Sequence, residues 1–295
     1  MIGMGFTGGP DEVWPAEVTH VRLWDNGVAW KDIHTAPDTY DWSKLDALVT
    51  KAGNRHITYV IAACPRWLAK YPDQAHYAPW LGPGSNSMPY SLDEANKFAW
   101  NLATRYAGKI KAYEVWNEPQ LADFLYPYND AECNTLASMT KRFFKTIKAC
   151  DPAALVLAAS VLPRESSGGM NKARRYLAAM QRQNWNADSM TCHIYPEVGY
   201  WGPRWKNMLQ DVTSTLKSMG CPTSKVWVTE TALGLLGPEI TDAAAIDTAV
   251  KAIYEAANGK FIFWYAANRP DLGGAQITFN PPSPLWESIK RWHNV

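Results

Sequence analysis

Neither sign of charge is in excess in this sequence of 295 residues, because 29 Lys and Arg residues against 28 Asp and Glu residues give a net charge of +1. No run of Lys or Arg provides the basic surface that nucleic acids or anionic membranes require. No stretch approaches the roughly 18 consecutive apolar residues that cross a bilayer. We therefore expect neither a nucleic-acid nor a membrane partner, and a small or neutral molecule as the ligand.

The first 15 residues also lack the basic head and the apolar segment of about 7 to 15 residues that mark a secretory signal. A chain from which a signal had been removed would look the same. The expected location is therefore secreted or periplasmic if a signal has been removed, and cytoplasmic otherwise.

Clustered metal ligands are missing as well. The five cysteines are odd in number and widely spaced, without a CxxC pair, which disfavours a zinc site and a disulfide framework but still allows one bridge. The six histidines are scattered, without HxH or HExxH, so a metal-dependent barrel hydrolase is not favoured. We expect no metal and no organic cofactor.

Tryptophan, by contrast, is abundant, with 15 residues against 8 phenylalanines. An indole is an awkward core residue unless its N–H finds a partner. Some tryptophans are therefore expected to face a ligand.

Apolar runs of strand length recur along the chain, and each is followed by turn residues and then by a longer stretch with helical spacing. Such continuous runs are typical of strands buried on both faces. Eight are predicted, at 2–6, 18–24, 57–63, 112–116, 154–160, 190–195, 225–230 and 260–266. Helices are predicted at 91–108, 132–152, 170–183, 203–219, 241–258 and 283–293.

Eight β-then-α units predict a parallel sheet closed into a (β/α)8 TIM barrel, an α/β fold with residues 1–295 as a single domain. No low-complexity linker divides the chain. A doubly wound open sheet is the alternative, but no GxGxxG follows the first strand.

Two glutamates follow predicted strands on opposite sides of this barrel: Glu118 after the fourth, in "VWNEPQ", and Glu230 at the end of the seventh, in "VWVTET". The C-terminal ends of barrel strands surround the active site. Two opposed carboxylates can act as the acid and the nucleophile of a glycoside hydrolase. The alternative is that each glutamate is a strand-end charge that reaches solvent.

The segments "WNEP", "HIYP" and "TET" resemble the clan A glycoside hydrolases. Within that clan, "YEVWNEPQLADFL", "DPAALVLAAS", "YDWSKLDALV" and "CPRWLA" most resemble glycoside hydrolase family 39 and its relatives that cleave bacterial exopolysaccharides. The resemblance implies that Glu118 is the acid/base and Glu230 the nucleophile. It also implies that Asn117 binds the sugar 2-hydroxyl and that Tyr195 hydrogen-bonds the nucleophile. His193 lies two residues before Tyr195, on the same side of the strand.

Arg22 and Trp264 take supporting roles from the same resemblance, whereas the other candidates below follow from their positions on strands and loops, and most have a plain structural alternative. Arg22 would lie beneath the nucleophile and lower its pKa, or form an ordinary ion pair at the barrel bottom. Trp264 would be a sugar platform, or core packing. Glu114 is interpreted as a buried partner of a barrel Arg or Lys, and Asp25 and Glu197 are other candidate carboxylates. Further sugar subsites, or loop packing, are considered for Trp24, Trp67, Trp80, Trp201 and Trp205.

The prediction is thus a monomeric retaining glycoside hydrolase that acts by double displacement on a polysaccharide or oligosaccharide. Endo action is expected. The alternatives are an exo-acting glycosidase on short glycosides and a catalytically inactive carbohydrate-binding barrel, which would need the rim aromatics without both glutamates.

Overall fold

The computed structural model describes residues 1–74, 76–164, 168–196, 201–222, 225–235 and 237–294. Eight of its strands form one sheet in the order β7-β6-β5-β2-β1-β10-β9-β8, and every pairing within it is parallel. These strands are β1 (Ile2–Gly5), β2 (Val18–Leu23), β5 (His56–Ile61), β6 (Ile110–Val115), β7 (Leu155–Leu157), β8 (Met190–Ile194), β9 (Val226–Thr231) and β10 (Ile262–Trp264). All eight predicted strands are present.

The sheet closes on itself between its two end strands. Parallel bridges join Leu157 to Ser189 and Val161 to Cys192. The backbone N–H of Val161 donates to Thr191, and that of His193 donates to Val161. The N–H groups of Ala158 and Asp188 add two further bonds across this seam, to Ser189 and Val156. The predicted (β/α)8 TIM barrel is therefore confirmed.

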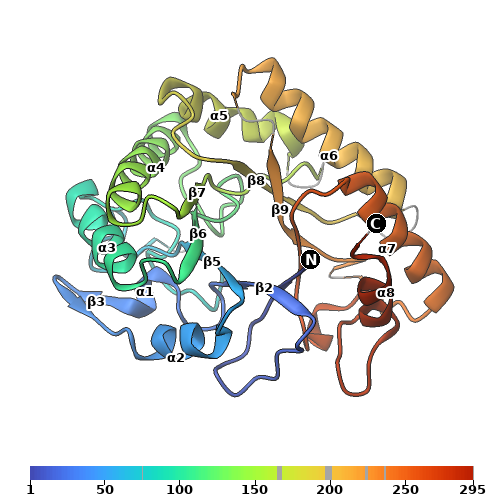
Figure 1. Cartoon of the computed structure of the whole chain (residues 1–295). Helices are drawn as coiled ribbons and strands as arrows, with labels where there is room; N and C mark the ends of the chain where they lie inside the picture. Colours follow the sequence, from blue (N-terminus) through green and yellow to red (C-terminus); the bar gives the residue numbers. More distant parts are fainter. Residues whose placement is uncertain (75, 165–167, 197–200, 223–224, 236, 295) are drawn as a thin grey trace.

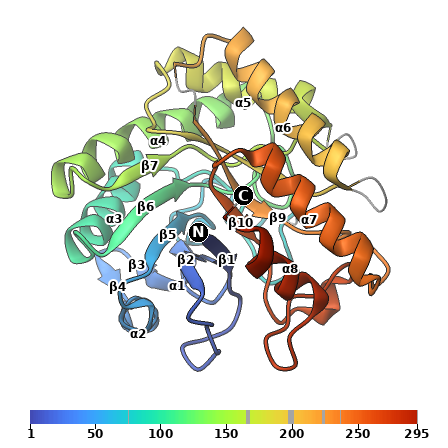
Figure 2. The ribbon, with the colours of Figure 1, turned by 45° about the vertical axis from the view of Figure 1, so that its right-hand side comes forward.

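Helices surround the strand ring, as Figure 1 and Figure 2 show from two directions. They are α1 (Trp30–Ile33), α2 (Ser43–Ala52), α3 (Leu92–Arg105), α4 (Asp130–Cys150), α5 (Gly169–Arg182), α6 (Trp201–Ser218), α7 (Ala243–Ala257) and α8 (Pro284–Trp292), with a 3-10 turn η2 at Pro270–Leu272. All six predicted helices are present. Three elements between β2 and β5 were not predicted: α1, α2 and a hairpin of β3 (His34–Ala36) with β4 (Thr39–Tyr40).

Helix starts follow from side-chain caps. The Ser91 hydroxyl accepts from the Glu94 N–H at the start of α3, and the Asn129 side chain accepts from the Glu132 N–H at the start of α4. Each cap satisfies a backbone donor that the helix itself leaves unpaired. These two caps therefore help to fix the residue at which each helix begins.

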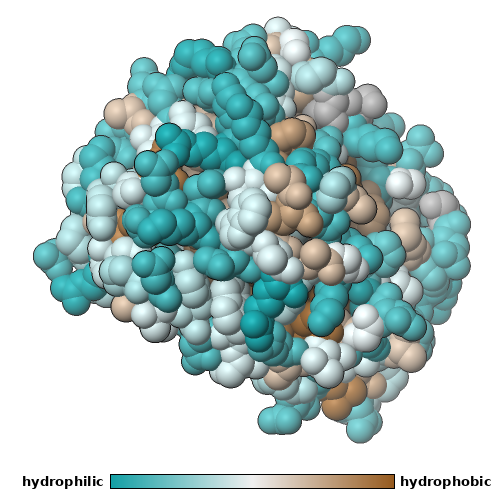
Figure 3. Space-filling model, turned by 60° about the vertical axis from the view of Figure 1, so that its left-hand side comes forward, coloured by the Kyte–Doolittle hydropathy of each residue, from teal (hydrophilic) through white to brown (hydrophobic). Residues whose placement is uncertain are grey.

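Apolar side chains from both faces of the sheet make up most of the core, and a polar layer interrupts it inside the barrel, where Arg22, Glu114, Thr191 and Thr229 are all buried. All five cysteines are free, so the one bridge that the sequence allowed is not formed. Within the described residues, every helix is too short or too polar to cross a bilayer. The face shown in Figure 3 is mainly hydrophilic, with apolar residues in small separate groups.

Candidate active site

The backbone that leaves β6 turns sharply to present Glu118. Trp116 and Glu118 both have positive φ angles, of 78° and 38°. Such angles are unfavourable for residues with a side chain and persist only where the surroundings fix them. Here the Trp116 indole donates to the Phe124 carbonyl at 2.7 Å, and the Glu118 N–H donates to the Ser160 hydroxyl at 3.2 Å. The chain after β6 is therefore held at two points around Glu118.

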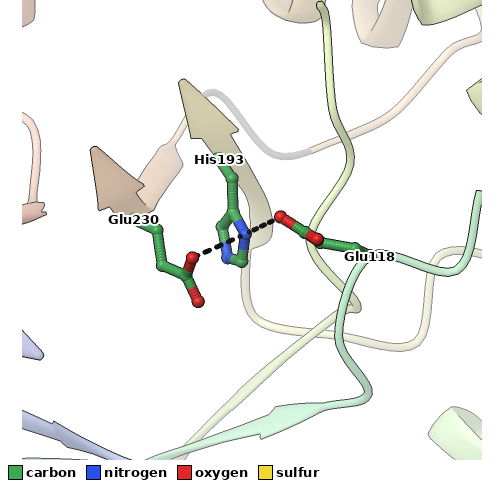
Figure 4. A group of neighbouring side chains, drawn as sticks. All are labelled: Glu118, His193 and Glu230. Carbon is green, nitrogen blue, oxygen red and sulfur yellow. Dashed lines mark hydrogen bonds and ion pairs between the residues drawn. The ribbon is translucent and has the colours of Figure 1, made fainter. Parts of the chain in front are cut away.

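Glu230 reaches the same place from the other side of the barrel mouth. It lies in β9, and its register partner in β8 is His193. Figure 4 shows the side chains of Glu118, His193 and Glu230 pointing toward one another. His193 Nδ1 lies 2.6 Å from Glu118 Oε1 and 3.3 Å from Glu230 Oε2, and one donor atom from each of the three residues lies within 4.8 Å of the others.

Beneath these carboxylates lies the buried guanidinium of Arg22 on β2. Its Nη1 donates to Glu230 at 2.5 Å, its Nη2 donates to Asn117 Oδ1 at 3.1 Å, and its Nε donates to Glu114 at 2.8 Å. The Tyr195 hydroxyl donates to the second oxygen of Glu230. Arg22, Asn117, Tyr195 and His193 are thus gathered around the two glutamates.

Glu114 plays the structural part that was expected of it. Its side chain is fully buried, and its second oxygen accepts hydrogen bonds from Thr191 at 2.9 Å and Thr229 at 2.8 Å. The carboxylate therefore fixes the orientation of Arg22 from below and does not reach the barrel mouth.

Burial dominates the acid–base properties of the site. It raises the pKa of Glu118 to about 7, against the opposing charges of Arg22 and Arg164. Burial also raises the pKa of Glu230, while His193, Arg22 and the Tyr195 hydroxyl act to lower it. The pKa of His193 is lowered to about 4 because its ring is buried, so the imidazole is neutral near pH 7.

Glu118, His193 and Glu230 could in principle bind a metal ion. Ligands at about 2.1 Å from one tetrahedral zinc ion stand roughly 3.4 Å apart. The 2.6 Å between His193 Nδ1 and Glu118 Oε1 is shorter than that and suits a hydrogen bond. The guanidinium of Arg22 also already pairs with Glu230. The arrangement fits proton sharing better than coordination.

For Trp264, the structure supports the packing alternative and not the predicted sugar platform. It is fully buried, and its indole donates at 2.9 Å to the Tyr254 hydroxyl of α7, so it packs in the barrel wall and has no face for a sugar. Successive strand side chains alternate between the two faces of a sheet. The next residue, Tyr265, points to the mouth instead, where its hydroxyl donates to Asp25 at 2.6 Å and Glu230 is among the charges that raise its pKa, after burial and Asp25. Tyr265 was missed, because an apolar run does not show which of two adjacent side chains faces the inside of the barrel.

The other candidate tryptophans differ in how far their side chains are exposed. Trp24 and Trp205 are buried; Trp24 packs against Phe124, and the Trp205 indole donates to Thr231 at 3.1 Å, so the packing alternative holds for both. Trp80 is 64% exposed. The side chain of Trp201 and residue Glu197 lie outside the described residues.

Trp67 is half-buried and follows β5, where its indole donates to the His34 carbonyl at 2.9 Å. It lines a cavity of about 790 Å³ together with Lys31, Arg66 and Leu81. One ring edge is thereby tied to the hairpin, while the side chain still borders open space. A role for Trp67 in binding sugar stays a prediction.

Comparison with known proteins finds no family model and no curated protein that matches this sequence. Solved structures do match. A monomeric β-xylosidase from Caulobacter crescentus is 17% identical with a TM-score of 0.70, over 94% of this chain and 62% of that one. A xylanase from Cellvibrio japonicus is 13% identical with a TM-score of 0.68, over 98% and 96%. A glucosidase from Croceicoccus marinus is 15% identical with a TM-score of 0.67, over 90% and 59%.

This chain therefore spans about three fifths of the length of the glucosidase and xylosidase chains that it matches, and nearly all of the xylanase chain. At identities of 13 to 17%, the likeness establishes that the chain shares its barrel fold with these three glycosidases.

Proposed function

We propose that this protein is a retaining glycoside hydrolase that cleaves O-glycosidic bonds of a polysaccharide or oligosaccharide. The observation that carries the proposal is the pairing of Glu118 with Glu230 across the barrel mouth, with carboxylate oxygens within 4.8 Å of each other. Retaining enzymes hold their two carboxyl groups about 5 to 5.5 Å apart, whereas inverting enzymes separate them by about 6.5 to 9.5 Å to admit a water. The short separation supports retention.

In the first half of the reaction, a Glu230 oxygen attacks the anomeric carbon while Glu118 protonates the departing glycosidic oxygen. The C–O bond to the leaving group breaks, and a glycosyl ester forms on Glu230. In the second half, ionised Glu118 takes a proton from water, and the resulting hydroxide displaces Glu230 from the sugar. Glu118 returns to its protonated form, and both carboxyl groups are regenerated.

The residues around the two glutamates suit the roles of nucleophile and acid/base. Arg22 and the Tyr195 hydroxyl each donate to Glu230, which favours the ionised form that a nucleophile requires. Asn117 Oδ1 accepts from Arg22, so its amide N–H groups are turned toward another acceptor, and the sugar 2-hydroxyl is the acceptor we assign to them.

His193 supports the protonated form of Glu118. A neutral imidazole that carries its proton on Nε2 accepts at Nδ1 from protonated Glu118. The 2.6 Å contact therefore suits the first half of the reaction, in which Glu118 is the acid. The ring holds the carboxyl group in position before it donates its proton.

Endo action is favoured by the cavity of about 790 Å³ beside Trp67, on the loop that follows β5. Loops after barrel strands lie on the same face as the active site. A cavity there, additional to the carboxylate pair, offers room for sugar units beyond the bond that is cleaved. The solved xylanase, xylosidase and glucosidase structures that share the fold make a β-linked glycan the first substrate class to try.

Substitution of the two glutamates tests the assignment directly. We expect Glu230→Gln to lower kcat at least about 1,000-fold, since it removes a nucleophile for which the site has no substitute. Glu118→Gln should impair natural glycosides far more than aryl glycosides with good leaving groups, which need little acid catalysis. Glu17→Gln, at an exposed position, is the matched control. Full activity of Glu230→Gln would remove the nucleophile assignment.

The pH profile tests the acid role of Glu118. Its pKa of about 7 means that the protonated acid is lost as pH rises through that value. We expect kcat/KM to fall about tenfold per pH unit above pH 7, because only the protonated fraction can donate. Profiles measured with an activated aryl glycoside should lose this basic limb in Glu118→Gln. If the limb persists in that variant, another group governs it.

Glu114→Gln tests the anchoring of Arg22. An amide that keeps both threonine bonds turns its NH2 toward the Arg22 Nε–H, so two donors face each other. We expect a loss of roughly 3 to 5 kcal/mol in stability and a shift of the acidic limb of kcat/KM, which reports Glu230. Glu132→Gln weakens the ion pair of another buried carboxylate, with the exposed Lys70, and should lower stability alone. If the acidic limb of the kcat/KM profile does not move in Glu114→Gln, the role of Glu114 is limited to stabilising the fold.

Product analysis distinguishes endo from exo action. With a panel of β-linked polysaccharides, we expect a rapid fall in viscosity and a ladder of oligosaccharides early in the reaction. Release of single sugars from chain ends, or turnover of aryl glycosides without any cleavage of polymer, would point to an exo-acting glycosidase instead.

A further inference from the structure

Helix α3 carries an exposed indole on the outer wall of the barrel. Of the tryptophans whose side chains the structure describes, only Trp80 and Trp100 are exposed, and Trp100 is 52% exposed. Trp80 belongs to the loop that follows β5, whereas Trp100 lies in the middle of α3, which Figure 1 shows outside the strand ring. The proposed mechanism uses no residue of this helix.

Core packing explains the opposite face of α3 but not the position of Trp100. The buried residues of the helix are Ala95, Phe98, Ala99, Leu102 and Ala103. Residues two positions apart on a helix, such as Phe98 and Trp100, are turned by about 200° relative to each other. Trp100 therefore points away from the barrel core.

Trp100 borders a hollow of about 360 Å³ on this outer face, together with Asp93, Asn96, Lys97 and Asn101. Asp93, Asn96 and Lys97 precede Trp100 by seven, four and three positions, and this spacing places them on the same side of the helix. The volume lies within the range of small-molecule sites, about 300 to 1,000 Å³. The hollow has room for a sugar ring beside the indole.

The charged side chains of the hollow already have partners of opposite charge. Lys97 Nζ lies 2.8 Å from a carboxylate oxygen of Glu94 and 3.7 Å from one of Asp38. Asp93 pairs with Arg142 of α4. A ligand that depended on its own charge would have to compete with these pairs, so the hollow favours an uncharged one.

The two asparagines keep hydrogen-bonding capacity for such a ligand. Asn96 Oδ1 accepts from the Thr146 hydroxyl at 2.8 Å, which leaves its two N–H donors. Asn101 Nδ2 donates to the Tyr40 hydroxyl at 3.2 Å and to the Lys97 carbonyl at 3.0 Å, which leaves Oδ1 as an acceptor. Within the described part of the chain, these remaining amide atoms have no other partner. Sugar hydroxyls both donate and accept, so they match the two amides.

We propose that this hollow is a second carbohydrate-binding site, separate from the active site, for one sugar unit of a neutral polysaccharide. The indole of Trp100 stacks on the apolar face of the sugar ring, Asn96 donates to its hydroxyls, and Asn101 accepts from them. The choice of a polysaccharide as the ligand rests on the proposed glycosidase function. A polymer held at α3 stays near the barrel mouth, which raises its effective concentration there.

Binding to an intact polymer tests the site. Glu230→Gln, which prevents cleavage, is compared with the double variant that also carries Trp100→Ala, by affinity electrophoresis in gels that contain a neutral xylan or a neutral β-glucan. We expect Trp100→Ala to raise the Kd for at least one polymer about fivefold or more, because the stacking surface is lost. Tyr90→Ala in the same background removes an aromatic side chain that is 62% exposed and lies outside the hollow lining, and it should leave the Kd unchanged.

The active protein provides a second readout. Trp100→Ala should lower kcat/KM on the polymer at least about threefold, because the polymer loses one of its two points of attachment. It should leave kcat/KM on an aryl glycoside unchanged, since that substrate is too short to reach α3 from the barrel mouth.

Equal electrophoretic retention with and without Trp100→Ala on every polymer would overturn the surface site and leave the glycosidase proposal intact. Binding that depends on Trp100, in a protein that hydrolyses no glycoside, would support the site while the proposed function fails. Sedimentation at several protein concentrations checks the other occupant, a second copy of the chain. A dimer that Trp100→Ala dissociates, with polymer binding unchanged, would assign the hollow to self-association and overturn the proposal.

Discussion

The desolvated guanidinium of Arg22 is the interaction on which the rest of the site depends. A buried cation is tolerated only where its charge is balanced and its donors are satisfied. Arg22 meets this requirement with two carboxylates and one amide, from Glu114, Glu230 and Asn117. The need to neutralise one cation thus brings together residues from three strands or their ends, β2, β6 and β9.

The same constraint makes the two glutamates chemically different. Glu230 is bonded to Arg22 and Tyr195, whereas the carboxylate of Glu118 contacts the neutral ring of His193. Different environments for two nearby carboxyl groups are what divides acid from nucleophile in a two-carboxylate site. The division of labour proposed for this pair therefore follows from where the cation lies in the barrel, and not from any difference between the two side chains themselves.

Much of this architecture could be predicted from the sequence, because continuous apolar runs and the motifs around Glu118 and Glu230 are local signals. The facing of individual strand residues could not be predicted, because an apolar run such as "FIFWYA" does not show which side chains point inward. The sequence therefore suggested Trp264 as the residue at the mouth, whereas Tyr265 lies there. The helix α2 was missed although Leu45, Leu48, Val49 and Ala52 form a buried stripe with helical spacing. The contacts of Arg22 join residues 92, 95 and 208 positions away, which no local pattern reveals.

The closure of the barrel between β7 and β8 has a consequence for the position of Glu118. The N–H of Glu118 is tied to Ser160, which lies just beyond β7, whereas His193 lies in β8. Backbone hydrogen bonds between Val161 and residues 191 and 193 join these two segments directly. The contact between His193 and Glu118 therefore spans a joint that the backbone itself fixes, so the alignment of these two side chains depends on how the sheet closes into a ring.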